Sequence, residues 1–203
     1  MRIFILLLIL IFSLQSWTKA DDIRDFEIEG MSVGDSALEY FNEKELKNKD
    51  DVLYYKSKTN KLFKFQTKSY RAYEKPKKFL VYENIEFHLK KDDPNYIIES
   101  IGGILYFRND LEGCIKKKNQ IVSEISRSFK DIKKEVFDLE PWLDLDPSGD
   151  TKTAHVYFSF KSGSYIEVSC YDWSDKFTKE KKWQDHLKVM LVSSDYDALF
   201  GGE

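Results

Sequence analysis

Cys114 and Cys170 are the two residues whose chemistry the sequence defines most closely. Cys114 lies in a stripe of apolar residues at helical spacing, within the stretch 111–129. Cys170 lies in an alternating stretch and shares its predicted face with Ile166 and Val168. Both thiols therefore point towards one core, and thiols so placed pair in an oxidising compartment. We predict a Cys114–Cys170 disulfide; the alternative is two buried free thiols that pack as small hydrophobic side chains.

A second candidate is the loop Asp144–Asp150, which has the opening spacing of a calcium-binding loop. Oxygen-bearing side chains alternate there, and Gly149 follows where a tight turn is needed. The closing ligand position, however, is occupied by His155 instead of a glutamate, and Pro147 interrupts the loop. We therefore predict an ordinary turn, and calcium binding stays open as the alternative.

The histidines are the next candidates for metal or acid–base chemistry. His88, His155 and His186 each lie alone on the polar face of a predicted strand. None of them forms a pair with the spacing of zinc ligands. We predict exposed surface histidines, no metal site and no cofactor.

Gly34-Asp35-Ser36 resembles the start of the Gly-Asp-Ser-Leu motif that defines a superfamily of lipases and esterases. This resemblance implies that Ser36 is a nucleophile. The fourth residue is Ala37 instead of leucine, and no histidine is preceded at the required distance by an aspartate. A serine needs these partners for activation. We therefore assign no catalytic residue, and keep a serine hydrolase built on Ser36 as the alternative function.

Aromatic residues make up 15% of the chain, and several fall on the strand face opposite the predicted core. Such a face binds glycans, peptides or a partner protein, or else it stabilises the sheet through cross-strand pairs. Both interpretations stay open. The residues concerned are Tyr54, Tyr55, Tyr82, Tyr96, Tyr106, Tyr157, Tyr165, Tyr171, Trp173 and Trp183.

Basic residues gather in two clusters, but the chain as a whole is acidic, with a net charge of −3. We predict solvated loops and no nucleic-acid partner, and a local patch for anionic groups is the alternative. The clusters are Lys68, Arg71, Lys75, Lys77 and Lys78, and then Lys176, Lys179, Lys181 and Lys182.

The elements that must position these residues follow from the period of the apolar residues. Residues 26–28 alternate like a strand, and Ser32 with Asp35 is typical of a helix start. From 52 to 107 the period is two, which predicts three antiparallel strands or four.

In the second half of the chain, Asn109 is predicted to cap a long amphipathic helix. Strands at 154–160, 166–170 and 187–191 follow, with a final short helix from Ser194. The order is roughly β-α-β-β-β-α-β-β-β. It predicts an α+β fold in which two main helices pack on one face of an antiparallel sheet of about six strands.

The N-terminus has the features of a secretory signal peptide. Met1-Arg2 is a short basic start, and the apolar run Ile3–Phe12 is too short to span a bilayer. We predict cleavage between Ala20 and Asp21, so that residues 21–203 form a single α+β domain that is periplasmic or secreted. Cleavage removes two basic residues and makes the chain more acidic; an uncleaved anchor is the alternative.

Composition excludes several classes of protein. The chain has 203 residues, 42% of them hydrophobic and 33% charged, which is too apolar for intrinsic disorder. Two cysteines are too few for a disulfide-dense mini-protein or a four-cysteine zinc module.

Two resemblances concern the block Gly30–Ser36. Together with Cys114 and Cys170, this block resembles an uncharacterised group of small exported bacterial proteins, for which no activity is implied. The helix entry Gly30-Met31-Ser32 is also similar to periplasmic domains of the β-lactamase-inhibitor-like α+β fold. With no catalytic set assembled, we expect an exported, non-catalytic binding or envelope-associated module with a protein, glycan or peptide partner and no stable membrane anchor.

Overall fold

The computed structural model describes residues 22–47, 65–71, 80–90, 93–129 and 132–197. The predicted signal peptide and its cleavage site at Ala20 and Asp21 lie outside these residues. So do Tyr54, Tyr55 and the basic residues at positions 75–78.

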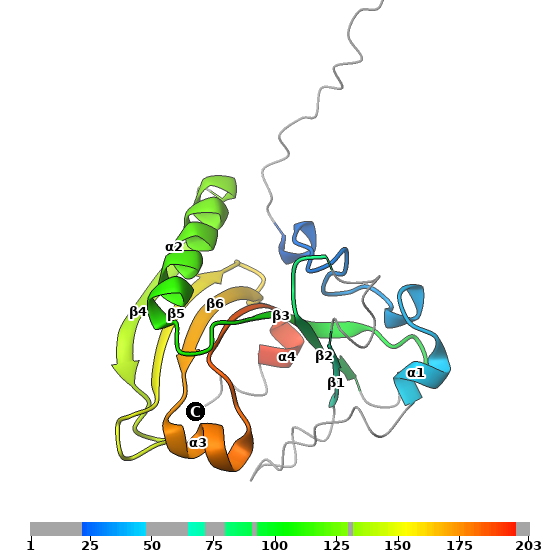
Figure 1. Cartoon of the computed structure of the whole chain (residues 1–203). Helices are drawn as coiled ribbons and strands as arrows, with labels where there is room; N and C mark the ends of the chain where they lie inside the picture. Colours follow the sequence, from blue (N-terminus) through cyan, green and yellow to red (C-terminus); the bar gives the residue numbers. More distant parts are fainter. Residues whose placement is uncertain (1–21, 48–64, 72–79, 91–92, 130–131, 198–203) are drawn as a thin grey trace, which may run out of the picture.

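A single antiparallel sheet of seven strands organises the described chain, so the predicted α+β class is confirmed (Figure 1). Every neighbouring pair of strands is antiparallel, and the strands lie in the order β1-β2-β3-β7-β6-β5-β4. The strands are β1 (Phe65–Arg71), β2 (Asn84–Lys90), β3 (Ile98–Tyr106), β4 (Lys133–Pro141), β5 (Lys152–Ser159), β6 (Tyr165–Asp172) and β7 (His186–Val192).

Helices lie on both sides of this sheet. Figure 1 shows α2 and the N-terminal segment on one side, and α3 and α4 towards the other. The described helices are α1 (Glu43–Lys47), α2 (Leu111–Ser128), α3 (Asp175–Lys181) and α4 (Ser194–Asp197), with the 3₁₀ turns η1 (Ile23–Asp25) and η2 (Ala37–Glu39).

The N-terminal segment differs from the prediction. The expected strand at 26–28 is only an isolated bridge, and the expected helix from Ser32 is wrong. The side chain of Asp35 accepts a hydrogen bond from the Ser32 N–H at 2.8 Å and so closes a turn. Gly34, with φ of +94°, continues this turn in a conformation that favours glycine. Ser36 then caps the short η2 by accepting from the Leu38 N–H.

Strand β4 is an element that the sequence analysis missed. Every one of its nine residues is exposed. Because neither face of β4 is buried, the apolar alternation that identified the other strands covers only residues 137–140 here. The long helix α2 was placed correctly, although its cap is Asp110, which accepts from the Gly113 N–H, instead of Asn109.

The apolar face of the sheet is the one that α2 covers. Alternate residues of the strands, including Phe87, Leu191 and Phe158, point to this face and are fully or almost fully buried. Cys170 belongs to this face and forms the predicted disulfide with Cys114 of α2, with the two Cα atoms 6.0 Å apart. The bond therefore fastens α2 to the middle of the sheet.

Removing this disulfide is expected to destabilise the protein strongly. It joins residues separated by 56 positions, and closing a loop of that length stabilises the fold by about 4 kcal/mol on the chain-entropy model. Urea unfolding of the native protein, of the reduced protein and of a Cys114→Ser/Cys170→Ser variant measures the loss. Equal midpoints for the native and reduced proteins, with two thiols titrated in the latter, would contradict this account.

Candidate functional site

The second face of the sheet carries polar and aromatic side chains, and we call it the polar face. Strand register places all three histidines on it, together with two carboxylates and a lysine. Its residues include Glu86, His88, Ser100, His155, Tyr157, Glu167, Ser169, Tyr171, His186 and Lys188.

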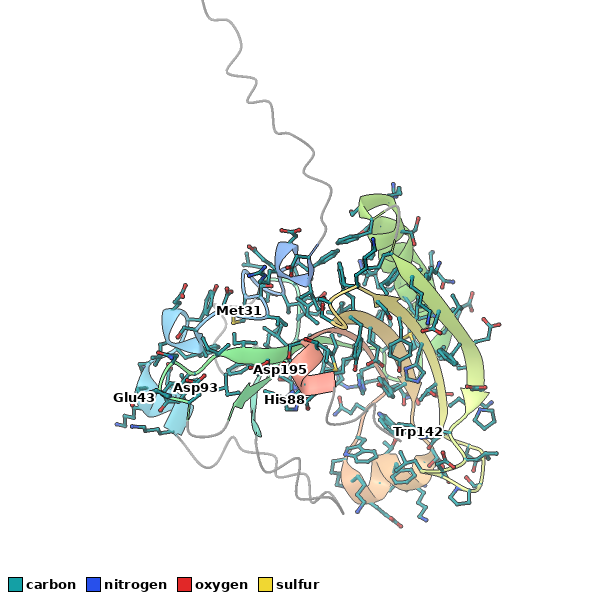
Figure 2. The ribbon with its side chains drawn as sticks, turned by 180° about the vertical axis from the view of Figure 1, so that it is seen from behind. Met31, Glu43, His88, Asp93, Trp142 and Asp195 are labelled. Carbon is teal, nitrogen blue, oxygen red and sulfur yellow. A yellow bond between two sulfur atoms is a disulfide. The ribbon has the colours of Figure 1, made fainter. Side chains whose placement is uncertain are left out.

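The predicted exposure of the histidines is wrong. Only 6% of His88 is exposed, and His155 and His186 are partly buried. Figure 2 shows the reason for His88, which lies beside α4. There the ring of Tyr196 packs on its imidazole, with 4.7 Å between ring centroids. The polar face is therefore a second buried layer rather than a solvated surface.

Glu86 and Lys188 form a largely buried ion pair on this face. The Lys188 Nζ lies 3.1 Å from the Glu86 Oε1, and the two side chains are 17% and 11% exposed. Burial alone would raise the pKa of Glu86, but the ammonium group of Lys188 outweighs it and holds the pKa below its ordinary value. Gly102 lies between the two strands, and a Cβ there would come within 3.0 Å of the Lys188 side chain. The glycine thus leaves room for the lysine to cross β3.

His88 and Ser100 face each other across β2 and β3. The His88 Nδ1 and the Ser100 Oγ are both buried, and neither has a hydrogen-bond partner in the described part of the chain. Burial lowers the pKa of His88 to about 4, which the nearby Glu86 only partly opposes. His88 is therefore neutral at physiological pH.

His155, Glu167 and Ser169 form a second polar cluster. The His155 Nδ1 lies 3.0 Å from the Glu167 carboxylate and 2.8 Å from the Ser169 hydroxyl, which donates to the same carboxylate. In a catalytic triad the serine and the acid bond to different ring nitrogens, whereas here both meet at Nδ1. Ser169 is also fully buried. This cluster therefore has the geometry of a structural network.

Aromatic rings run along the polar face from this cluster towards α3, as the sequence analysis expected for residues opposite the core. Tyr171 stacks on His186 at 4.7 Å between centroids and on Trp173 at 5.5 Å. Burial raises the pKa of Tyr171 well above its ordinary value, so its phenol stays neutral.

Three tryptophans gather where these rings end, and we call Trp142, Trp173 and Trp183 the tryptophan end. Their ring centroids lie 6.1 Å apart for Trp142 and Trp173, and 4.5 Å apart for Trp173 and Trp183. Figure 2 shows Trp142 beside α3. Trp142 and Trp183 are 37% and 38% exposed, and the buried Nε1–H of Trp173 has no partner among the described residues. Trp173 and Trp183 belong to the aromatic set that the strand pattern predicted opposite the core, whereas Trp142, which follows β4, does not.

Hydrogen bonds hold the tryptophan end in place. The loop 144–150 is a turn, as predicted, and it closes on Asp146, which accepts from the N–H and hydroxyl groups of both Ser148 and Thr151. The Thr151 carbonyl accepts from the Trp142 N–H at 2.9 Å. These bonds keep the pKa of Asp146 well below its ordinary range. Asp146, one of the carboxylates of the calcium hypothesis, is thus hydrogen-bonded within the protein.

The second support is Asp185. One of its oxygens accepts from the Trp173 N–H at 2.8 Å, and the other accepts from the Asn109 N–H at 3.0 Å. This single carboxylate ties the end of β6 to the loop before α2. Trp142 and Trp173 are therefore anchored through their backbones, and the ring of Trp142 is partly exposed.

Ser36 lies away from these clusters, in the turn that precedes η2. Its hydroxyl donates to the Asn95 carbonyl at 2.6 Å and accepts from the Leu38 N–H. Both of these partners belong to the main chain, which is the arrangement of a capping residue. Within the described ranges, no group of three or more histidine, cysteine, aspartate or glutamate side chains is arranged to hold a metal ion.

Lowering the pH is expected to destabilise the fold through the buried histidines. Burial holds the pKa of His88 and of His186 at about 4, below the ordinary 6.5. Between these values the unfolded chain binds protons that the folded chain does not, so stability is full above pH 6.5 and falls towards pH 4. Urea unfolding between about pH 7 and pH 4.5 should show a loss of a few kcal/mol.

The control for this prediction is His88→Gln, which cannot titrate in that range. We expect a shallower loss of stability with falling pH than in the natural protein. Equal slopes in the two proteins would show that His88 is not held neutral by the fold.

Replacing one member of the Glu86–Lys188 pair is expected to lower the free energy of unfolding more than replacing both members. Lys188→Met leaves an unpaired buried carboxylate and should destabilise by about 3–5 kcal/mol, whereas Glu86→Leu/Lys188→Met should recover part of this loss. The exposed pair Lys133–Glu135 is the matched control, and its loss should change stability by less than about 1 kcal/mol. Additive effects at Glu86 and Lys188 would contradict the coupling.

Comparison with known proteins gives no relative for this chain. No family model, curated protein or solved structure matches it. The two resemblances noted for the block Gly30–Ser36 therefore stay predictions.

Proposed function

We propose that this protein is an exported, non-catalytic binding or envelope-associated module whose ligand surface is the tryptophan end. A glycan, a peptide or an exposed segment of a partner protein is the ligand. Indole rings offer such ligands a large contact area at a small cost in conformational entropy.

One observation carries this proposal: two indoles exposed by more than a third, Trp142 and Trp183, both pack against Trp173, so that three indole rings form one cluster. The anchoring of the Trp142 and Trp173 backbones gives the ligand a preformed surface.

Binding is favoured over catalysis because the buried carboxylates of the polar face are engaged with other side chains of the protein. Glu86 is paired with Lys188, and Glu167 accepts from Ser169 and contacts His155. Groups that neutralise one another inside the fold are not poised to activate a substrate. The capping role of Ser36 likewise gives no support to the hydrolase alternative.

Export is supported by chemistry as well as by the signal-like N-terminus. The Cys114–Cys170 disulfide is compatible with an oxidising, extracellular compartment. No helix among the described residues is long and apolar enough to cross a membrane.

The test is a screen of the secreted, processed chain against glycan and peptide arrays. We expect a Trp142→Ala/Trp183→Ala variant to lose at least about 100-fold in affinity for any array ligand that the natural protein binds, since two interface anchors of this kind are worth about 3 kcal/mol or more together. Leu38→Ala, which removes an apolar side chain of similar exposure (42%) elsewhere, is the control and should bind normally.

Two results would contradict the proposal. One is a bound ligand whose affinity the double tryptophan variant leaves unchanged. The other is labelling of the native protein by a fluorophosphonate probe that is lost in Ser36→Ala, since this would identify an activated serine.

A further inference from the structure

Arg108 is an exposed arginine whose guanidinium is positioned by two contacts. Its Nε donates to the Gln184 Oε1 at 2.7 Å, and its Cζ lies over the ring of Tyr106, 5.5 Å from the centroid. Arg108 and Gln184 are both exposed. Since the Nε is already bonded, the terminal N–H groups of the guanidinium are the donors that remain for a further acceptor.

Strand register brings Arg108 into line with the tryptophan end. The residues side by side on the polar face at the ends of β3, β7 and β6 are Tyr106, His186 and Tyr171. Side chains return to one face after two residues, so the next positions outward on this face are Arg108, Gln184 and Trp173. The Phe107 N–H donates to the Asp185 carbonyl at 2.8 Å, as the continued pairing requires. Neighbouring strands are about 5 Å apart, which puts Arg108 and Trp173 about 10 Å apart across the sheet.

Within the described ranges, no carboxylate forms an ion pair with Arg108. The carboxylates of the adjoining segments accept main-chain N–H groups instead, and these are Glu83, Asp110 and Asp185. The chain as a whole has a net charge of −3 and so has no general attraction for anions. An anionic group that binds here must therefore be held by Arg108 itself.

Charge divides the surroundings of the tryptophan end into two sides. The exposed carboxylates that flank Trp142 in the chain are those of Glu140, Asp144 and Asp150. Lysines outnumber carboxylates in α3 and in the turn that leads to Trp183. An anionic group of a ligand is therefore favoured on the side of Arg108 and Trp183, and it is opposed on the side of Trp142.

A sugar acid meets the requirements of both neighbouring surfaces. A guanidinium binds a carboxylate through two parallel N–H···O bonds, and an arginine positioned in advance loses less side-chain entropy on binding. Indole rings accept the apolar face of a sugar ring. In a uronic acid the carboxylate is attached to the sugar ring itself, so one glycan places a carboxylate and an apolar ring face side by side.

An acidic peptide fits this surface less well, because each of its residues brings a main-chain N–H and C=O that need partners. The protein's own main-chain donors at this end are already bonded. Trp142 donates to the Thr151 carbonyl, and Asn109 and Trp173 donate to the Asp185 carboxylate. Both β6 and β7 also have a strand on each side, so neither offers an edge for a peptide strand.

We propose that the ligand of the tryptophan end is an acidic glycan, in which Arg108 binds a uronate carboxylate while Trp173 and Trp183 contact the sugar rings. The amide of Gln184, between Arg108 and Trp173, donates to a sugar hydroxyl. This inference rests on the proposed function and deepens it, because it names the class of ligand and the side on which its charge lies.

The test measures binding of soluble oligosaccharides of galacturonate, of mannuronate and of hyaluronan by isothermal titration calorimetry at physiological ionic strength. Methyl esters of the same oligosaccharides are the matched uncharged ligands. The processed chain should bind at least one of the acids. It should bind the corresponding ester at least about tenfold more weakly, since the charge-assisted hydrogen bonds to the carboxylate are lost.

Arg108→Gln should weaken binding of the acid by at least about tenfold and leave binding of the ester unchanged. Arg108→Lys keeps the charge but not the fork, so its affinity for the acid should lie between those of the natural protein and Arg108→Gln. The matched control is Arg127→Gln, because Arg127 is also exposed and is also bonded through its Nε, to the Ser123 carbonyl of α2. It should bind like the natural protein.

Failure to bind any of the three acids would overturn the inference. So would equal affinities for acid and ester, normal binding of the acid by Arg108→Gln, or equally tight binding of a polyglutamate peptide through Arg108. An array ligand that requires Trp142 and Trp183 but not Arg108 would overturn this inference and leave the proposed function intact. An acidic glycan that binds without either tryptophan would instead contradict the proposed function.

Discussion

The burial of charged and histidine side chains on the polar face is the constraint on which the rest of the structure depends. An apolar core needs only to be filled, but a buried carboxylate must find a cation or several donors. Glu86 forms an ion pair with Lys188. Glu167 accepts a hydrogen bond from Ser169 and contacts His155. These pairings require β2, β3, β7 and β6 to be in one register, so the polar face specifies which strands are neighbours.

The two faces of the sheet therefore have different roles: one forms the apolar core, and the other leads to the candidate ligand surface. The apolar face, fastened to α2 by the disulfide, contributes the buried core that stabilises the fold. The polar face passes from charged pairs near α4 to stacked rings near α3, where Asp146 and Asp185 hold loops that carry tryptophans. The candidate ligand surface is therefore the tryptophan end, where these hydrogen bonds hold the backbone in place.

Sequence patterns predicted the features that depend only on the spacing of apolar residues along a strand or a helix. The alternation around Ile166 and Cys170 identified the buried face of β6 and, with the stripe of α2, the disulfide. Exposure of the histidines could not be predicted, because His88 is buried by Tyr196 from a helix more than a hundred residues later. β4 was not predicted because, in an edge strand exposed on both faces, the alternation covers only residues 137–140. The pair Ser32 and Asp35 looked like a helix cap, but the same hydrogen-bonding groups close a turn.

The central claim is that ligands bind at the tryptophan end, and the indole N–H resonances of the processed chain test it most directly. Of the four tryptophans, only Trp17 lies in the predicted signal peptide, so three indole signals are expected. Titration of an array ligand into the ¹⁵N-labelled protein should shift the signals of Trp142 and Trp183, whose rings are exposed, and of Trp173, which packs against both of them. Binding that leaves all three signals in place and instead shifts amides of α2 or of the N-terminal turns would contradict the claim.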